Sequence, residues 1–186
     1  MTHAELARRI YATSHLTGDF TLRSGQHTHE YFDKYRFEGD PALLDAIAEQ
    51  MAPLVPAGVQ LLAGLEMGGI PVVTALSRHT GLPCAFVRKQ AKTYGTCRLA
   101  EGADVAGQRV LVVEDVVTSG GQIVISTAEL RTLGAEISAA LCVIDRQQGG
   151  SEALAAEGIK LLSLMTASDL RSASQASGEN ANPSPV

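Results

Sequence analysis

The residues best suited to chemistry stand together past the middle of the chain. Two adjacent carboxylates, Glu114 and Asp115, are followed closely by segment 118–121, which supplies two hydroxyls and then two glycines. Hydroxyls and backbone N–H groups at the start of a helix bind phosphate. Carboxylates beside such a phosphate cradle are expected when the ligand also has hydroxyl groups, or a metal ion, that the carboxylates can bind. A sugar phosphate bound with Mg²⁺ fits this combination.

The flanking pattern indicates which elements position these residues. Segment 109–113 is a near-continuous run of branched apolar residues, which is typical of a parallel strand buried on both faces. Segment 123–133 has apolar residues at helical spacing, and Gly134 is a plausible stop. The polar turn is therefore expected at the carboxyl end of a strand, where open parallel sheets bind their ligands.

The rest of the chain alternates strand and helix signals, which predicts an α/β fold with a mostly parallel central sheet flanked by helices. Further strands are expected at 59–63, 83–87, 136–144 and 159–164, and helices at 4–14, 41–54, from about 71 to 78, at 151–157 and at 166–170. Two short strands, within 17–25 and 31–33, predict a small N-terminal hood, although a plain edge hairpin explains them about as well.

Length and composition favour a single domain. The chain has 186 residues, and we expect residues 1–171 to form one domain, with the hood built mainly by residues 1–38. Residues 172–186 have no large apolar residue before Val186 and are expected to be disordered. The net charge of −5 argues against a broad nucleic-acid-binding surface. The sequence has no membrane-length apolar run and no signal-peptide core, and its three cysteines are interpreted as reduced thiols, which favours a cytoplasmic protein.

Two further segments could bind anions. Segment 88–98 has four cations within eleven residues of an otherwise acidic chain, which favours an anion-binding lid over a solvated surface loop. Arg146 follows a predicted strand and could hold a planar carboxylate, although an ion pair with Asp145 explains it equally well. The glycine-rich segment 64–71 predicts a second turn where the backbone approaches a ligand closely.

Four motifs, which follow one another along the chain in the family's order, resemble those of the type I phosphoribosyltransferases. More narrowly, they resemble those of the orotate phosphoribosyltransferase family. Segment 112–121 resembles the motif with which these enzymes bind their diphosphorylated ribose substrate. The other three are similar to the orotate enzymes' hood, mobile catalytic loop and orotate-binding turn, and they stand at 18–33, 88–102 and 145–150. The resemblance covers roughly residues 5 to 170.

The resemblance implies a reaction and its components. The phosphoribosyl group of 5-phospho-α-D-ribose 1-diphosphate (PRPP) would pass to orotate, giving orotidine 5′-monophosphate and diphosphate in de novo pyrimidine (UMP) biosynthesis. Mg²⁺ is the implied cofactor, bound mainly through substrate and water near Asp115 and not directly by the protein. A homodimer with shared active sites is implied, with no nucleic acid and no membrane as partner.

Site residues are carried over by position. The catalytic residues implied are Arg88, Lys92 and Asp115. The PRPP-binding residues implied are Glu66, Gly68, Arg88, Lys89, Lys92, Tyr94, Glu114, Asp115, Val116, Val117, Thr118, Ser119, Gly120, Gly121 and Gln122. The orotate-binding residues implied are Arg23, Tyr31, Phe32, Thr118 and Arg146. Two positions depart from the family pattern: Tyr94 stands where a His is common, and Arg23 stands where a Lys is common. A tyrosine hydroxyl can still donate a hydrogen bond to phosphate, and Arg23 keeps the charge.

Two rival functions remain at this stage. A phosphoribosyltransferase for a purine or for uracil would share the phosphate cradle, but a neutral base gives Arg146 no carboxylate to hold. A PRPP-sensing regulator without catalysis would bind nucleic acid, which the acidic net charge and the intact cationic segment disfavour.

Overall fold

The structure is a computed structural model that describes residues 1–21, 25–90 and 98–178. It is an α/β fold around a six-stranded sheet in the order β5-β4-β3-β6-β7-β8. The strands are β3 (Leu61–Leu65), β4 (Cys84–Val87), β5 (Ala100–Gly102), β6 (Arg109–Val117), β7 (Glu136–Asp145) and β8 (Lys160–Thr166). Every neighbouring pair is parallel except β4 and β5, which are antiparallel. The predicted fold class is confirmed.

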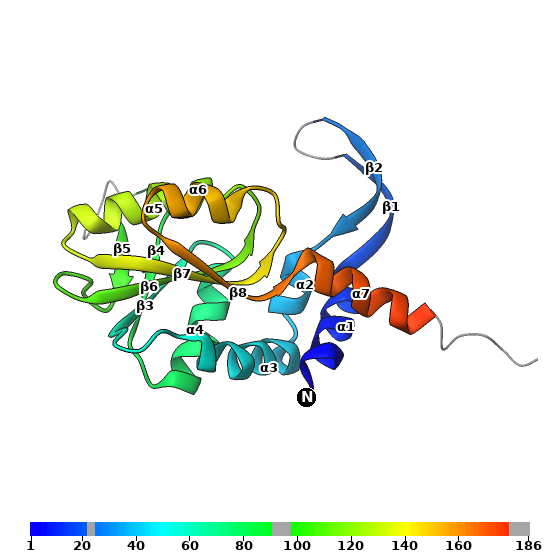
Figure 1. Ribbon diagram of the computed structural model, residues 1–186, viewed down its shortest axis with the longest axis horizontal. Coiled ribbons are helices and arrows are strands. Elements are labelled where there is room, and N and C mark those ends of the chain that lie inside the picture. Colours follow the sequence, from blue (N-terminus) through cyan, green and yellow to red (C-terminus); the bar gives the residue numbers. More distant parts are fainter. Residues whose placement is uncertain (22–24, 91–97, 179–186) are drawn as a thin grey trace, which may run out of the picture.

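Helices cover both faces of this sheet (Figure 1). One face is covered by α5 (Gly121–Thr132) and α6 (Gly150–Ala156), and the other by α3 (Pro41–Met51) and α4 (Gly69–Thr80), with a 3-10 turn, η1 (Ala52–Leu54), after α3. Three further helices gather beside β8: α1 (His3–Ser14), α2 (Lys34–Glu38) and α7 (Ala167–Gly178). The antiparallel hairpin of β1 (His15–Thr21) and β2 (His27–Phe32) projects away from the body of the sheet.

Two apolar cores lie on opposite faces of the sheet. Leu111 and Val113 of β6 belong to the core under α3 and α4, whereas Val110 and Val112 belong to the core under α5 and α6. Successive side chains of a strand point to opposite faces, so a strand with helices on both sides must be apolar throughout. This explains the unbroken apolar run in the sequence, and it fixes the carboxyl end of β6 between two packed layers.

The C-terminal helix is longer than the sequence pattern predicted. Residues 172–178, which we expected to be disordered, belong to α7. The helix begins with a capping box, in which Asp169 Oδ2 accepts from Thr166 N at 2.7 Å and Thr166 Oγ1 accepts from Asp169 N at 3.2 Å. Leu170 is buried and Ala173 packs against the first core, so small residues hold the helix on α1 where no large apolar residue is available.

Three local differences from the expected elements bear on the site. The hood contains a short helix, α2, whose N-terminal cap is Asp33. Segment 88–102 ends in β5, which pairs with β4 at the edge of the sheet. Gly64 belongs to β3 and not to the turn, and it must be glycine because a Cβ there would fall 2.4 Å from Val73 Cγ1 of α4. In the part of the chain that is described, no helix is long and apolar enough to cross a membrane.

Candidate active site

A phosphate-sized cavity of about 190 Å³ lies between β6 and α5, where the sequence predicted a cradle. It is lined by Glu114, Val116, Val117, Thr118, Ser119, Gly120, Gly121, Gln122 and Ile123. Gly120 has a φ of 75°, and no side chain caps the start of α5, so the first N–H groups of this helix are available to a ligand. The structure therefore gathers all the expected cradle residues around one small cavity suited to an anion.

The two carboxylates that precede the cradle have different surroundings. Glu114 opens onto the cradle, whereas Asp115 is fully buried and points toward α2. Asp115 Oδ2 forms an ion pair with Lys34 Nζ at 2.5 Å, and Oδ1 accepts a hydrogen bond from Val116 N at 2.5 Å. Both oxygens of Asp115 are thus tied to fixed partners, and Glu38 of α2 is buried beside it.

The charges in this cluster follow from burial and mutual contact. Burial, and then the hydrogen bond with Asp115, raise the pKa of Glu38 to about 9. The same two causes raise the pKa of Glu114 well above its usual range. Burial alone would raise the pKa of Asp115, but hydrogen bonds from Glu114, Glu38 and Lys34 lower it. Glu38 therefore keeps its proton near neutral pH, while the hydrogen bonds and the charged Lys34 favour the ionised form of Asp115.

The turn after β3 closes on the same cluster. A Cβ at Gly68 would lie 1.6 Å from Asp115 Oδ2 and 2.8 Å from Glu38 Oε1, so only glycine fits there. The peptide bond between Glu66 and Met67 is cis. Glu66 Oε1 accepts a hydrogen bond from Lys89 N at 2.5 Å, which joins this turn to the start of the cationic segment. The glycine-rich turn after β3 thus lies next to the start of the cationic segment after β4 and next to Asp115 at the end of β6. All three are at the carboxyl ends of their strands.

The cationic segment is described in part. Arg88 lies after β4 and faces Glu101 of β5, with 4.0 Å between Arg88 Nε and Glu101 Oε1. Lys89 is held by its backbone to Glu66. Three residues expected in the site, Arg23, Lys92 and Tyr94, lie outside the described residues.

A second cavity, of about 130 Å³, lies beside the cradle and suits a flat ring. Its lining residues are Tyr11, Phe32, Val116, Ile144, Arg146, Ala167, Leu170 and Arg171. Arg146 and Phe32 were expected at an acceptor site, and the structure brings them to one cavity. Thr118, expected to face both substrates, lines the cradle. Tyr31 is absent from both linings: it is 43% exposed, and its ring centroid lies 5.4 Å from that of Phe20 on the hairpin.

Sequence reasoning missed several residues at the second cavity and around Asp115. Lys34 and Glu38 have the i, i+4 spacing of an ordinary exposed pair, which gives no signal of burial. Arg171 came directly after the short helix predicted at 166–170, and Tyr11 lay in the predicted helix 4–14, to which no site residue was assigned. Arg171 Nη2 donates to Ser168 Oγ at 3.0 Å, and Ser168 Oγ donates to Gln147 Oε1 at 2.6 Å, so α7 is tied to the turn that presents Arg146.

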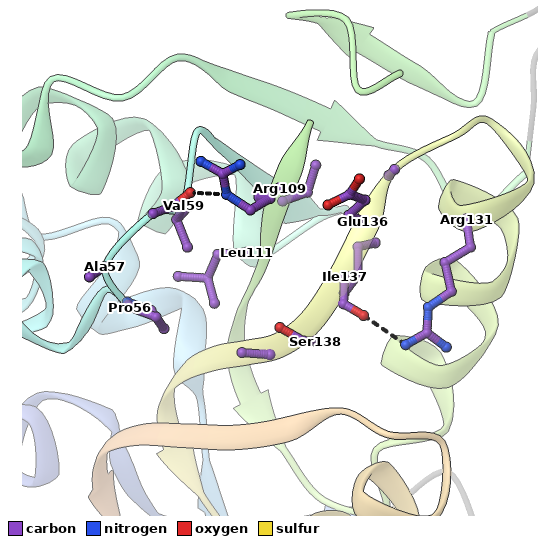
Figure 2. Close-up of a pocket in the computed structure, with 13 residues that line it drawn as sticks. Pro56, Ala57, Val59, Arg109, Leu111, Arg131, Glu136, Ile137 and Ser138 are labelled. Carbon is purple, nitrogen blue, oxygen red and sulfur yellow. Dashed lines mark hydrogen bonds between the residues drawn. The ribbon is translucent and has the colours of Figure 1, made fainter. Parts of the chain in front are cut away.

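A further cavity lies at the opposite end of the sheet from the cradle. A cavity of about 510 Å³ lies at the amino ends of β3, β6 and β7, with Arg109 and Arg131 on its walls (Figure 2). Both guanidinium groups donate hydrogen bonds to backbone carbonyl oxygens: Arg109 Nε donates to Gly58 O at 2.6 Å, and Arg131 Nη2 donates to Ile137 O at 2.7 Å. Ligands of open parallel sheets bind at the opposite, carboxyl end. We therefore assign this cavity no part in the chemistry.

Glu38 gives a prediction about pH and stability. Its pKa is about 9 in the folded protein, against 4.5 as the ordinary value. A raised pKa means that the folded state binds the proton more tightly, so this contribution is complete below about pH 4.5 and is lost as pH rises through 9. Denaturant unfolding at about pH 5.5 and about pH 8.5 should show that Glu38→Gln loses less stability over this interval than the original protein, by up to about 1.4 kcal/mol per pH unit. Parallel pH profiles would contradict a protonated Glu38.

The fold and the two adjoining cavities define a class of protein. Residues 40–160 match the family described as phosphoribosyl transferase domain. This match runs from just before α3 to the first residue of β8, so it includes the cradle and the turn after β3. The protein is therefore a phosphoribosyltransferase.

Similar proteins narrow the class. An orotate phosphoribosyltransferase from Nocardioides sp. is 51% identical over 173 residues, which are 93% of this chain and 97% of that protein. Another from Methanocella arvoryzae is 44% identical, with 82% of this chain and 87% of that protein covered. The crystal structure of Mycobacterium tuberculosis orotate phosphoribosyltransferase in complex with PRPP has a TM-score of 0.79 and 32% identity, covering 91% of this chain and 98% of that one. The chain belongs to the orotate phosphoribosyltransferase family.

Proposed function

We propose that this protein transfers the phosphoribosyl group of PRPP to orotate, producing orotidine 5′-monophosphate and diphosphate. The observation that carries the proposal is the adjacency of a phosphate cradle to a small cavity with two guanidinium groups, Arg146 and Arg171, on its walls. Two guanidinium groups favour an anionic acceptor such as orotate over a neutral purine or uracil. Phe32 and Tyr11 supply aromatic surface for the pyrimidine ring.

The chemistry requires a stabilised leaving group and a dry site. As the anomeric diphosphate leaves, the ribose acquires oxocarbenium character, which favours electrostatic stabilisation over a covalent nucleophile. The cradle would hold the 5′-phosphate through backbone N–H groups and the hydroxyls of Thr118 and Ser119. Glu114 and Asp115 would hold the ribose hydroxyls, and the cations Arg88, Lys89 and Lys92 would offset the charge of the departing diphosphate, with Tyr94 as a hydrogen-bond donor. Gly68 and Glu66 would shape the diphosphate side.

Mg²⁺ belongs to this proposal as a substrate-bound ion. In the described residues, no group of three His, Cys, Asp or Glu side chains is placed to hold a metal. Asp115 has both oxygens engaged by Lys34 and Val116, so the donor set fits an ion held mainly by substrate oxygens and water. Bound in this way, the ion would supply Lewis-acid stabilisation of the diphosphate.

Assembly and location are further parts of the proposal. By resemblance to the family, we infer a homodimer in which the cationic segment serves the partner's site. We also place the protein in the cytoplasm, a reducing compartment that suits the free thiols of Cys84 and Cys142.

An absorbance assay tests the function. The purified protein should consume orotate, followed by the loss of its ultraviolet absorbance, only when PRPP and Mg²⁺ are both present. Turnover of uracil or of a purine, with orotate unused, would replace this proposal by the neutral-base alternative. Binding of PRPP without turnover of any base would favour the sensing regulator.

A further inference from the structure

The cluster of Lys34, Glu38 and Asp115 joins three segments that are distant in the sequence. Lys34 and Glu38 come from α2, Asp115 comes from the end of β6, and Gly68 from the turn after β3 closes against them. Asp115 is 0% exposed and Glu38 is 7% exposed. Buried ionised groups are rarely tolerated without a specific partner, so this arrangement calls for a reason beyond packing.

We propose that Lys34 is a positioning residue for the ribose of PRPP, which acts by fixing the orientation and the charge of Asp115. The inference deepens the function proposed above and rests on the same site. Lys34 does not need to touch the substrate in this role. Glu38, the third side chain of the cluster and also from α2, hydrogen-bonds to Asp115 and helps to fix its orientation.

The geometry around Asp115 carries the argument. A carboxylate turns about its terminal bond unless both oxygens are held, and here Val116 N holds Oδ1 while Lys34 Nζ holds Oδ2, each at 2.5 Å. Glu114 and Glu38 also hydrogen-bond to Asp115, so four partners set the orientation of this carboxylate before a ribose binds. A carboxylate oriented in advance takes part in ribose binding without losing rotational freedom at the moment of binding.

The environment of Lys34 also points to this role. Its side chain is 33% exposed, but its ammonium group faces a fully buried oxygen. Burial alone would lower the pKa of Lys34, yet the contact with Asp115 raises it, so the lysine stays charged. Its length and position therefore serve to bring one positive charge to one buried carboxylate.

Calorimetric titration with PRPP in the presence of Mg²⁺ provides the test, because it does not depend on which base is the acceptor. We expect Lys34→Met to weaken PRPP binding by about 10- to 100-fold, as loss of an orienting partner behind a binding group commonly does. Lys34→Arg should restore most of the affinity, since it keeps the charge. Binding of inorganic diphosphate, which has no ribose, should stay within about twofold of the original protein.

Asp115→Asn provides the background that separates positioning from general stability. In that background Lys34→Met leaves no buried unpaired carboxylate, so the variant should fold, and the second substitution should cost little further PRPP affinity. Lys160→Met, at the far end of β8, is the matched control and should change nothing. The proposal is overturned if Lys34→Met leaves PRPP affinity unchanged, if diphosphate binding falls equally, or if the loss is as large in the Asp115→Asn background. If the protein is active in the orotate assay and shows any of these results, the role of Lys34 is rejected and the proposed function stands.

Discussion

Asp115→Asn should lower kcat/KM for PRPP by on the order of 10² to 10³, the range found when a fixed electrostatic partner of the transition state is removed. Hydrogen bonds from Glu114, Glu38 and Lys34 lower the pKa of Asp115, which favours the charged form of this carboxyl group. An amide keeps the shape but loses the charge that a developing oxocarbenium ion and the ribose hydroxyls would meet. Steady-state kinetics with varied PRPP at saturating orotate measures the effect.

The control for this variant must separate lost charge from lost structure. Asp45→Asn is suitable, because Asp45 is an exposed carboxylate of α3 paired with His79 at 2.9 Å and lies away from both cavities. Asp115→Asn also leaves Lys34 without its partner, and breaking a buried pair costs about 3–5 kcal/mol of stability. Activity is therefore compared at a temperature where both variants give the folded circular dichroism spectrum. Equal activity of the two variants would remove Asp115 from the reaction.

The turn between β6 and α5 could be predicted because its signal is local. The strand, the polar turn and the helix around Thr118 are contiguous in the sequence, and the periodicity changes where the turn begins. A phosphate cradle depends on backbone N–H groups and on glycine conformations such as the φ of 75° at Gly120, and both are encoded within a few residues. The resemblance to a family then supplied the substrate, which no local pattern specifies.

The surroundings of Asp115 could not be predicted because they depend on how distant elements dock. A lysine and a glutamate four residues apart usually lie on a solvated helix face, and nothing between Lys34 and Glu38 reveals that β6 ends against them. The same limit applies to Gly64, which was expected in a turn but allows α4 to approach β3.

The lining of the second cavity was predicted in part for a related reason. Phe32 and Tyr31 are adjacent in an exposed hairpin, and strand alternation sends one toward the cavity and the other toward Phe20. Sequence alone does not reveal which is which, because neither face of the hairpin has a continuous apolar pattern. Arg171 was missed because the predicted helix ended at residue 170, next to a stretch of mostly small residues that resembles a disordered tail in composition.

Arg146→Ala should raise the KM for orotate by about 10- to 100-fold, the equivalent of losing one charged hydrogen-bonding group of about 1.5–3 kcal/mol. Arg146 lines the ring-sized cavity and is exposed to a ligand there, while its backbone N–H is fixed to Val117 O at 2.9 Å. The side chain is therefore dispensable for the turn, and truncation should remove a ligand contact without disturbing the fold.

Two measurements decide whether Arg146 holds the orotate carboxylate. PRPP affinity from calorimetry should stay near that of the original protein, since the cradle residues are untouched; a collapse of PRPP affinity would move Arg146 to the donor side. Arg109→Ala, at the amino ends of the strands, is the matched arginine control and should leave the KM for orotate unchanged. Arg171→Ala should raise that KM less than Arg146→Ala, because its guanidinium also holds Ser168 and so is only partly available to a ligand. The reverse order would assign the carboxylate to α7, which the sequence pattern gave no reason to include in the site.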